Sequence, residues 1–168
     1  MLGLSVTEDT IAMRARVGYM PERGGLPSDQ TAADFMIYAA ELAGIPPKAA
    51  KQRASDVPTL VGLHEERFRH LGDFSTGMRQ RALLAQAIVH GPRILFLDEP
   101  TNGLDPPQIR TMREVLINYA QTGRTVLVSS HLLAEVEQTC THVVVMNRGS
   151  VISSGTVREL TEAGGQTE

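Results

Sequence analysis

Cysteine, lysine and long apolar runs are all scarce in this sequence of 168 residues. The lone cysteine, Cys140, excludes an internal disulfide bond, and no group of cysteines and histidines has the spacing of a zinc site. The longest apolar runs, such as 94–97 and 143–146, fall far short of the roughly 18 residues that a membrane-spanning helix needs. The first residues carry neither the charged nor the apolar segment of an export signal, so we expect none.

Positive charge is not in excess either. The 16 basic residues are outnumbered by 19 acidic ones, which gives a net charge of -3. Without a basic surface to attract phosphate backbones, we expect no nucleic acid partner. Hydrophobic residues make up 42% and charged residues 21% of the chain, a balance that is typical of a folded soluble domain and not of a disordered one.

What the sequence does contain is an alternation of strands and amphipathic helices, the pattern that builds a parallel sheet covered by helices. Strands are predicted over residues 16–20, 94–97, 125–128 and 142–146. Helices are predicted over residues 32–42, 48–63, 75–90, 107–120 and 132–139, and after Thr156. Since the later strands are near-continuous apolar runs, we expect both of their faces to be buried, and we expect Pro58 to kink or interrupt its helix. The fold class is therefore α/β, with an early helical lobe.

The sharpest local feature is the apolar strand 94–97, which runs directly into Asp98 and Glu99. Ligand sites of open α/β sheets lie at the carboxyl ends of the strands. Two adjacent carboxylates repel each other, so they are retained most naturally where a cation offsets their charge, and Mg²⁺ with a polyphosphate is a common case. Taken alone, the two acids fit a solvated acidic turn equally well.

Two further segments could serve a phosphate group. The strand 125–128 is followed by two serines and His131, so this histidine is expected at the same sheet edge as the acids. There its imidazole could hold a phosphate oxygen or an attacking water, although a structural histidine is the alternative. The segment 75–77 begins a helix, where free backbone amides bind anions, but a plain helix cap also explains it.

Taken in order, these segments resemble the nucleotide-binding domain of ATP-binding cassette (ABC) transporters, over nearly the whole chain from about Arg16. The matching segments are the Q-loop at 18–22, the signature motif at 74–78, the Walker B motif at 94–99, the D-loop at 102–105 and the switch histidine His131. Glu22 stands where the family usually has glutamine, and Met78 ends the signature. These two departures resemble exporter-type cassettes that work with a separate membrane permease.

The resemblance implies a partial P-loop NTPase fold of the ABC cassette, with a mostly parallel sheet, flanking helices and a helical lobe. Its implied parts are a Q-loop region at 1–30, a helical lobe at 31–73, a core at 74–147, and a C-terminal hairpin with a short helix at 148–168. It also implies ATP and Mg²⁺ as cofactors. The helical lobe would face the permease.

The resemblance also assigns roles at the acidic end of the sheet. Asp98 would hold Mg²⁺, and Glu99 would orient or deprotonate the attacking water. His131 would stabilise the γ-phosphate, so that positioning and electrostatics lower the barrier to hydrolysis. Glu22 would sense the Mg²⁺ or the water and couple the site to the helical lobe.

The remaining implied roles act across a head-to-tail dimer, in which each ATP lies between one subunit's phosphate loop and the other's signature helix. The residues that would reach the ATP of the opposite subunit are Ser75, Thr76, Gly77 and Met78. Asp105 would communicate across the dimer. The implied partners are a membrane permease subunit and a second ABC ATP-binding subunit, with the complex on the cytoplasmic, inner face of the cell membrane.

One element of the family pattern is absent from this sequence. No G-x-x-x-x-G-K followed by Ser or Thr occurs, and neither Lys48 nor Lys51 follows a glycine. Such a loop cradles the phosphates with backbone amides and neutralises them with its lysine. The family carries it upstream of the Q-loop, where this chain has only 21 residues before Glu22. We therefore expect weak or no independent ATPase activity.

The absent loop also has a structural implication. In this architecture the strand that feeds the phosphate loop lies in the middle of the sheet, beside the Walker B strand. Without it, we expect the strand 94–97 to keep unpaired backbone groups and an uncovered face.

Three hypotheses about function follow. The first is an exporter ATP-binding subunit whose N-terminal lobe is absent because the gene start is misassigned or the gene is truncated. The second is a non-catalytic partner that lends its signature helix to a complete cassette. The third, a soluble DNA-repair or chromosome-type ATPase, is disfavoured because no long heptad segment and no basic stripe occur.

Overall fold

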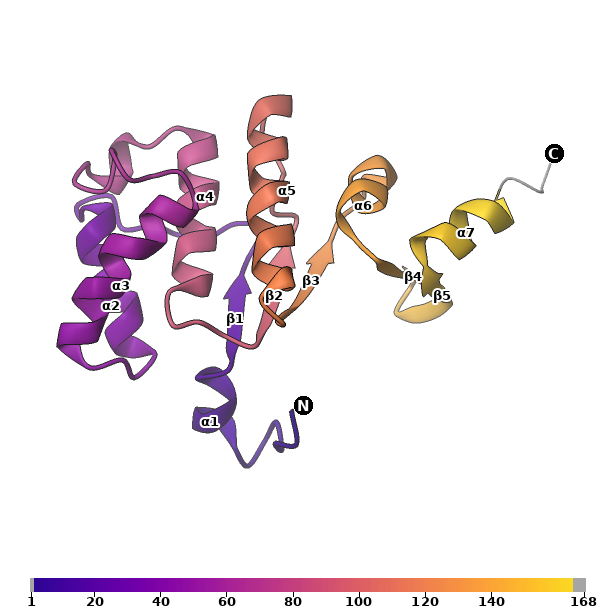
Figure 1. Ribbon diagram of the computed structural model, residues 1–168, viewed down its shortest axis with the longest axis horizontal. Helices are drawn as coiled ribbons and strands as arrows, with labels where there is room; N and C mark the ends of the chain where they lie inside the picture. The colour runs from indigo at the N-terminus through magenta and orange to yellow at the C-terminus, as the bar shows by residue number, and fades with distance from the viewer. Residues whose placement is uncertain (1, 165–168) are drawn as a thin grey trace. The chain divides into compact units, whose positions relative to one another are not determined.

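The computed structural model describes residues 2–164, which form two compact units that divide between Ser129 and Ser130. The first unit holds the helical lobe and a three-stranded sheet (Figure 1). Its elements are α1 (Thr10–Arg14), β1 (Val17–Met20), α2 (Ala32–Leu42), α3 (Pro47–Leu60), a 3-10 turn (Leu71–Asp73), α4 (Thr76–Ile88), β2 (Ile94–Asp98), α5 (Pro106–Gln121) and β3 (Thr125–Ser129). The predicted α/β class is confirmed by this order of elements.

The sheet of the first unit has the order β1-β2-β3, and both pairs of strands are parallel. One face is buried: Met20, Leu95 and Leu97 are almost wholly inaccessible and belong to the same hydrophobic core as side chains of α4 and α5. Parallel neighbours bring their carboxyl ends to one edge of the sheet. The chain segments that follow β1, β2 and β3 therefore start from the same edge.

The opposite face of the sheet is open. Tyr19 and Leu127 are 58% and 45% exposed, and Phe96, which lies between them in the register, is half-buried. The expectation that these strands are buried on both faces is wrong for β2 and β3, because every second side chain points to this uncovered side. It is also wrong for the strand predicted at 142–146, where Val144, Val145 and Met146 are exposed. The uncovered face predicted for the strand 94–97 is confirmed.

The backbone of β2 contradicts the other half of that prediction. We expected the strand 94–97 to keep unpaired backbone groups, but β2 is the central strand and pairs along its length with both neighbours. In this sheet it is the outer strands, β1 and β3, that each pair on one side only. An apolar run reveals that a strand is buried, but it carries no information about the order of the strands.

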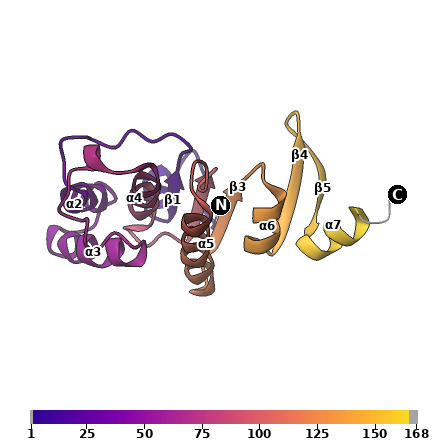
Figure 2. The same ribbon diagram turned by 90° about the horizontal axis from the view of Figure 1, so that it is seen from above.

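The helical lobe consists of α2 and α3, which pack side by side, with α4 next to α2 (Figure 2). Thr31 begins α2, because its side-chain oxygen accepts a hydrogen bond from the Asp34 backbone amide at 3.1 Å. The helix α3 continues through Pro58 and ends at Leu60, so this proline does not interrupt it. Pro58 lies in the last turn, where the loss of one backbone hydrogen bond leaves the preceding turns intact.

The second unit begins with α6 (Leu133–Thr139), continues through an antiparallel hairpin of β4 (His142–Asn147) and β5 (Ser150–Thr156), and ends with α7 (Val157–Gly164). The hairpin turns at Arg148 and Gly149, which both take positive φ, +48° and +81°. Two positive φ values in succession match the twist of the strands that they join.

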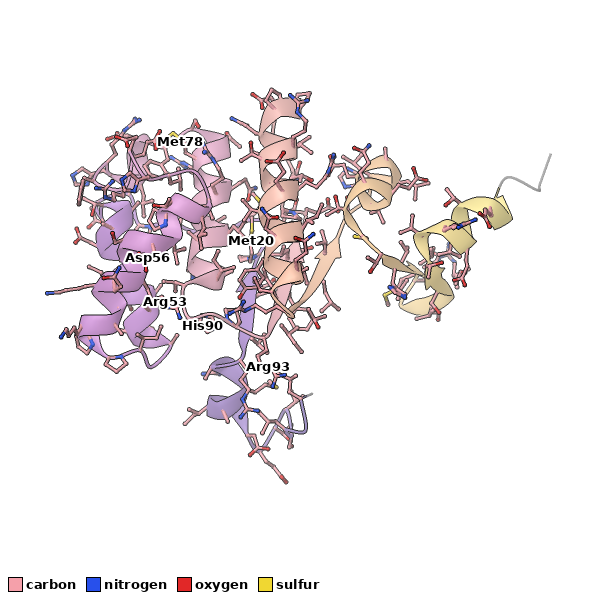
Figure 3. All side chains as sticks on the ribbon, viewed as in Figure 1. Met20, Arg53, Asp56, Met78, His90 and Arg93 are labelled. Atoms are coloured by element: carbon pink, nitrogen blue, oxygen red, sulfur yellow. The ribbon has the colours of Figure 1, made fainter. Side chains whose placement is uncertain are left out.

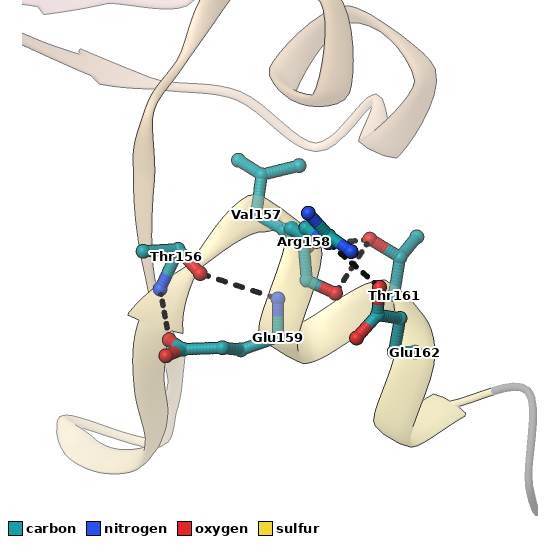
Figure 4. A network of polar contacts seen from close by, with 6 residues as sticks. All are labelled: Thr156, Val157, Arg158, Glu159, Thr161 and Glu162. Carbon is teal, nitrogen blue, oxygen red and sulfur yellow. Dashed lines mark hydrogen bonds and ion pairs between the residues drawn. The ribbon is translucent and has the colours of Figure 1, made fainter.

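A reciprocal pair of hydrogen bonds begins α7 (Figure 4). The Thr156 hydroxyl accepts from the Glu159 amide at 3.2 Å, and the Glu159 carboxylate accepts from the Thr156 amide at 2.8 Å. The helix predicted after Thr156 is therefore confirmed. These bonds favour the ionised carboxylate and so lower the pKa of Glu159. One turn further on, an exposed ion pair joins Arg158 to Glu162 at 2.8 Å.

Candidate functional site

The carboxyl ends of β2 and β3 are joined by a side-chain hydrogen bond. Asp98 and Ser129 are partners in the parallel register, and the Ser129 hydroxyl donates to Asp98 Oδ1 at 2.5 Å. The Glu99 amide in turn donates to Ser129 Oγ at 3.2 Å. These bonds hold the two acids predicted from the sequence against the end of the neighbouring strand. Sequence reasoning did not assign Ser129 a role, because the bond depends on which strand lies beside β2.

Glu99 has an uncommon backbone conformation, with φ of +46°. A left-handed conformation costs a residue with a side chain on the order of 1–2 kcal/mol, so it persists only where its surroundings impose it. Here the chain leaves β2 in a tight turn, in which the Asn102 amide donates to the Glu99 carbonyl at 3.1 Å and the Leu104 amide to the Thr101 carbonyl at 3.1 Å. Strain of this kind gathers at functional sites.

Glu22, which follows the end of β1, contacts the same turn. Its Oε1 accepts a hydrogen bond from Asn102 Nδ2 at 3.1 Å, across a separation of 80 residues. The segment predicted as a Q-loop and the segment predicted as a D-loop are thus in direct contact. We did not expect Asn102 to provide this contact, because nothing in the local pattern distinguishes its side chain from that of any turn asparagine.

The signature segment begins α4. Ser75 is the N-cap, and its Oγ accepts from the Met78 amide at 3.3 Å. Ser75 and Thr76 are exposed, Met78 is half-buried and Gly77 is buried. A Cβ at Gly77 would lie 2.5 Å from Gln108 Nε2, so only glycine fits at this position without displacing that side chain.

Asp105 begins α5 with a capping box. Its Oδ1 accepts from the Gln108 amide at 2.9 Å, while Gln108 Oε1 accepts from the Asp105 amide at 3.3 Å. A helix cap explains the choice of aspartate at this position. Because Gln108 also lies against Gly77, the capping box connects the start of α5 to the start of α4.

His131 lies in the second unit, ahead of α6, whereas Asp98 and Glu99 belong to the first. Its expected place beside the two acids stays a prediction. In the part of the chain that the structure describes, no three side chains of the His, Cys, Asp or Glu types gather as metal ligands would. No helix within residues 2–164 is long and apolar enough to cross a membrane.

A pocket that the sequence did not indicate lies between β1, α2 and α4, with a volume of about 240 Å³. Its lining residues include Tyr19, Phe35, Tyr38, Leu42 and His90. Tyr38 and Leu42 are exposed, so part of this apolar lining faces solvent.

His90, at the end of α4, lies by the start of β1 (Figure 3). Its Nε2 forms a 3.0 Å hydrogen bond with the Val17 carbonyl, which can only accept, so this nitrogen carries the proton. Burial lowers the pKa of His90, and the nearby Arg53 acts in the same direction, while the bond to Val17 opposes them. Together these effects favour the neutral form of the ring.

Comparison with known proteins agrees with this geometry. Residues 3–102 match the family model described as ABC transporter. The match covers more than half of the chain, and this protein therefore belongs to the ABC transporter family.

Several curated relatives are ATP-binding proteins of bacterial transporters. The bacitracin transport ATP-binding protein BcrA of Enterococcus faecalis is 35% identical over 95% of this chain and 51% of its own length. The linearmycin resistance ATP-binding protein LnrL of Bacillus subtilis is 31% identical over 98% of this chain and 53% of its own. An uncharacterized ABC transporter ATP-binding protein of Nostoc sp. is 36% identical over 88% and 45%. The chain spans about half the length of these relatives.

A solved structure of an ATP-binding subunit of an ABC transporter superposes on 98% of this chain and 69% of its own, with a TM-score of 0.84 and 25% identity. The ABC cassette fold predicted from the motifs is confirmed by this match.

Proposed function

We propose that this chain is part of the ATP-binding subunit of an ABC transporter, which couples ATP binding and hydrolysis to export through a separate membrane permease. The observation that carries the proposal is the placing of Glu22, Asp98 and Ser129 where three adjacent parallel strands end. Asn102 joins Glu22 to the turn that follows Asp98. The relatives named for bacitracin transport and linearmycin resistance support export as the direction.

ATP and Mg²⁺ are the proposed cofactors, since ATP-binding domains of this family bind ATP, generally with Mg²⁺. Magnesium sites commonly use one or two carboxylates together with substrate phosphates and water. The Asp98 carboxylate fits such a donor set, and the hydrogen bond from the Ser129 hydroxyl to its Oδ1 would hold it in place. A bound Mg²⁺ would neutralise charge on the phosphates. Asp98 would hold the ion, and Glu99 would orient the attacking water and accept its proton.

Two further residues would act around this centre. Glu22, through its bond to Asn102, would link changes at the acids to the helical lobe. His131 would stabilise the γ-phosphate as a hydrogen-bond donor. Both roles remain proposals.

The signature segment is proposed to act on an ATP held by a second cassette. Ser75 and Thr76 are exposed at the start of the 13-residue helix α4, where backbone amides and the helix dipole favour an anion. Ser75 Oγ already accepts from the Met78 amide, and its O–H remains available to donate to a phosphate oxygen. Gly77 and Met78 would complete this contact, and Asp105 would lie close to the partner cassette.

The helical lobe is proposed to face the permease. The pocket lined by Tyr19, Tyr38 and Leu42 opens beside α2 and offers apolar and aromatic surface of the kind enriched at protein interfaces. With this partner, the protein would lie on the cytoplasmic, inner face of the cell membrane.

A second candidate function is a non-catalytic cassette that donates its signature helix to a complete subunit. It is favoured by one specific observation, the exposed Ser75 at the start of α4. The coding DNA separates the two candidates. An in-frame phosphate loop upstream of Met1 supports the catalytic subunit, and a stop codon close upstream supports the non-catalytic partner.

An ATPase measurement tests the proposal. We expect the purified chain to hydrolyse Mg-ATP at close to the background rate, and we expect it to restore hydrolysis when it is mixed with a cassette that has a phosphate loop but an inactivated signature motif. Ser75→Arg should abolish the restored rate, because a long cation at the cap blocks the approach of the phosphate. Ser154→Arg, at an exposed serine of β5, is the matched control.

The opposite results would overturn these assignments. Hydrolysis by the chain alone at the rate of a complete cassette, abolished by Glu99→Gln, would show that no second phosphate loop is needed. Equal effects of Ser75→Arg and Ser154→Arg would remove the proposed role of the signature segment.

A further inference from the structure

Gln80 is the one buried side chain of the polar or charged types within residues 2–164, with 8% of its surface exposed. It lies on α4, one turn after Gly77, on the covered side of the helix. Its Nε2 donates to the Asn102 carbonyl at 3.5 Å, while its Oε1 has no hydrogen-bond partner. Burying an amide that is only half satisfied costs free energy, so a buried glutamine at this position calls for an explanation beyond packing.

Gln80 contacts Asn102, which forms hydrogen bonds to several parts of the site. Asn102 accepts from Gln80 through its carbonyl, donates to Glu22 Oε1 through its side chain at 3.1 Å, and donates to the Glu99 carbonyl through its amide at 3.1 Å. One residue thus joins the helix α4, the turn after β2 and the segment after β1. A displacement of α4 at Gln80 would therefore act on Asn102, whose side chain holds Glu22 and whose amide holds the Glu99 carbonyl.

A second contact connects the same helix to the far end of this turn. Gly77 is packed against the side chain of Gln108, which completes the capping box with Asp105. The helix α4 therefore contacts the middle of the turn at Asn102 and, through Gln108, the cap at its end. Neither contact depends on another subunit.

We propose that Gln80 is a positioning residue that couples the helix carrying Ser75 to the acidic turn and Glu22 of its own chain. The significance of this coupling rests on the proposed function: a phosphate bound at Ser75 shifts α4, and Gln80 carries the shift to Asn102. The link is held by one long hydrogen bond beside an unpartnered oxygen, an arrangement that a small movement can remake.

Amide hydrogen exchange of the nucleotide-free chain, followed residue by residue by NMR, tests the coupling. The Asn102 and Leu104 amides, which donate within the turn, report on its stability. Gln80→Met keeps the volume but removes the donor, and we expect exchange at both amides to accelerate about tenfold, the effect of losing one hydrogen bond. Gln121→Met, at an exposed glutamine at the end of α5, is the control that should change neither rate.

Gln80→Glu provides a readout that a packing role would not move. A protonated carboxyl can donate to the Asn102 carbonyl, whereas a carboxylate cannot. Protection of the Leu104 amide should therefore be present at low pH and be lost as the new carboxyl ionises, at a pH above the ordinary value for glutamate because the position is buried. The pH profile of the wild-type chain is the reference.

The outcomes are distinct. Unchanged exchange in Gln80→Met, or the wild-type pH profile in Gln80→Glu, overturns the proposal. If Gln80→Met loosens the whole unit, as faster exchange of the Ala43 amide of α2 would reveal, Gln80→Glu decides alone, and the wild-type pH profile in that variant refutes the coupling. Because these measurements use neither nucleotide nor a partner, a negative result would refute the coupling without deciding the proposed function.

Discussion

Gly18→Ala is expected to destabilise the first unit strongly, because β1 and α4 approach each other at this position without space for a side chain. A Cβ at Gly18 would lie 2.2 Å from the Ala87 carbonyl oxygen, 2.8 Å from Leu95 Cδ1 and 2.9 Å from Pro92 Cγ. The nearest atom is helix backbone, which cannot rotate away, so β1 and α4 must separate. Overpacking against such an obstacle costs about 3 kcal/mol.

A smaller effect opposes this cost. Alanine restricts the unfolded chain more than glycine does, which returns up to about 1 kcal/mol. The net loss in the free energy of unfolding is then about 2 kcal/mol, or roughly 5–10 °C in the midpoint of thermal unfolding. Urea unfolding followed by circular dichroism measures it. Gly25→Ala is the matched control, because nothing lies within 4 Å of a Cβ there, and it should leave stability unchanged or slightly raised. A loss for Gly18→Ala below about 0.5 kcal/mol, or equal to that of the control, would refute the argument.

Three further changes test other parts of the structure. Asp105→Ala removes the cap of α5 and should lower the free energy of unfolding by about 1 kcal/mol in urea titrations; an unchanged midpoint would deny the cap a role in stability. Burial lowers the pKa of His90, so this histidine takes up a proton in the unfolded chain before it does in the folded one as the pH falls. The free energy of unfolding should therefore be at its full value above pH 6.5 and decline below it. His90→Gln should lose that part of the decline, and a plot of the free energy of unfolding against pH that runs parallel to the wild-type plot would contradict this. Tyr119→Phe removes the 2.8 Å bond to the Pro92 carbonyl and should cost about 1 kcal/mol. Burial raises the pKa of Tyr119 to about 12, so an ultraviolet titration should lose a late-ionising phenol in this variant, and an unchanged curve would show that another tyrosine ionises there.

Local patterns were sufficient to predict most of the elements. The spacing of apolar residues and the flanking Thr31 and Gly44 placed a helix at 32–42, and the structure has it with the same bounds. The strand ending in Asp98 was predicted to within one residue. These signals are contained in neighbouring residues, so they are readable without knowledge of the fold.

The arrangement of the elements was harder to predict, because it depends on residues far apart in the chain. The bond from Ser129 to Asp98 needs the strand order, and the bond from Asn102 to Glu22 joins residues that are 80 positions apart. The positive φ of Glu99 could not be predicted from the neighbouring residues either, because glutamate does not favour this conformation. The candidate site was thus predictable as a set of residues but not as a set of contacts.

The one-sided pairing of β3 makes concentration a variable in every experiment on this chain. Backbone donors and acceptors along Thr125–Ser129 lie at the margin of the sheet, beside the exposed side chain of Leu127. Strand margins of this kind recruit other strands, and natural proteins discourage such recruitment with lysine. Dilution series should therefore accompany hydrolysis and exchange measurements, and Leu127→Lys would provide a sample in which self-association is suppressed.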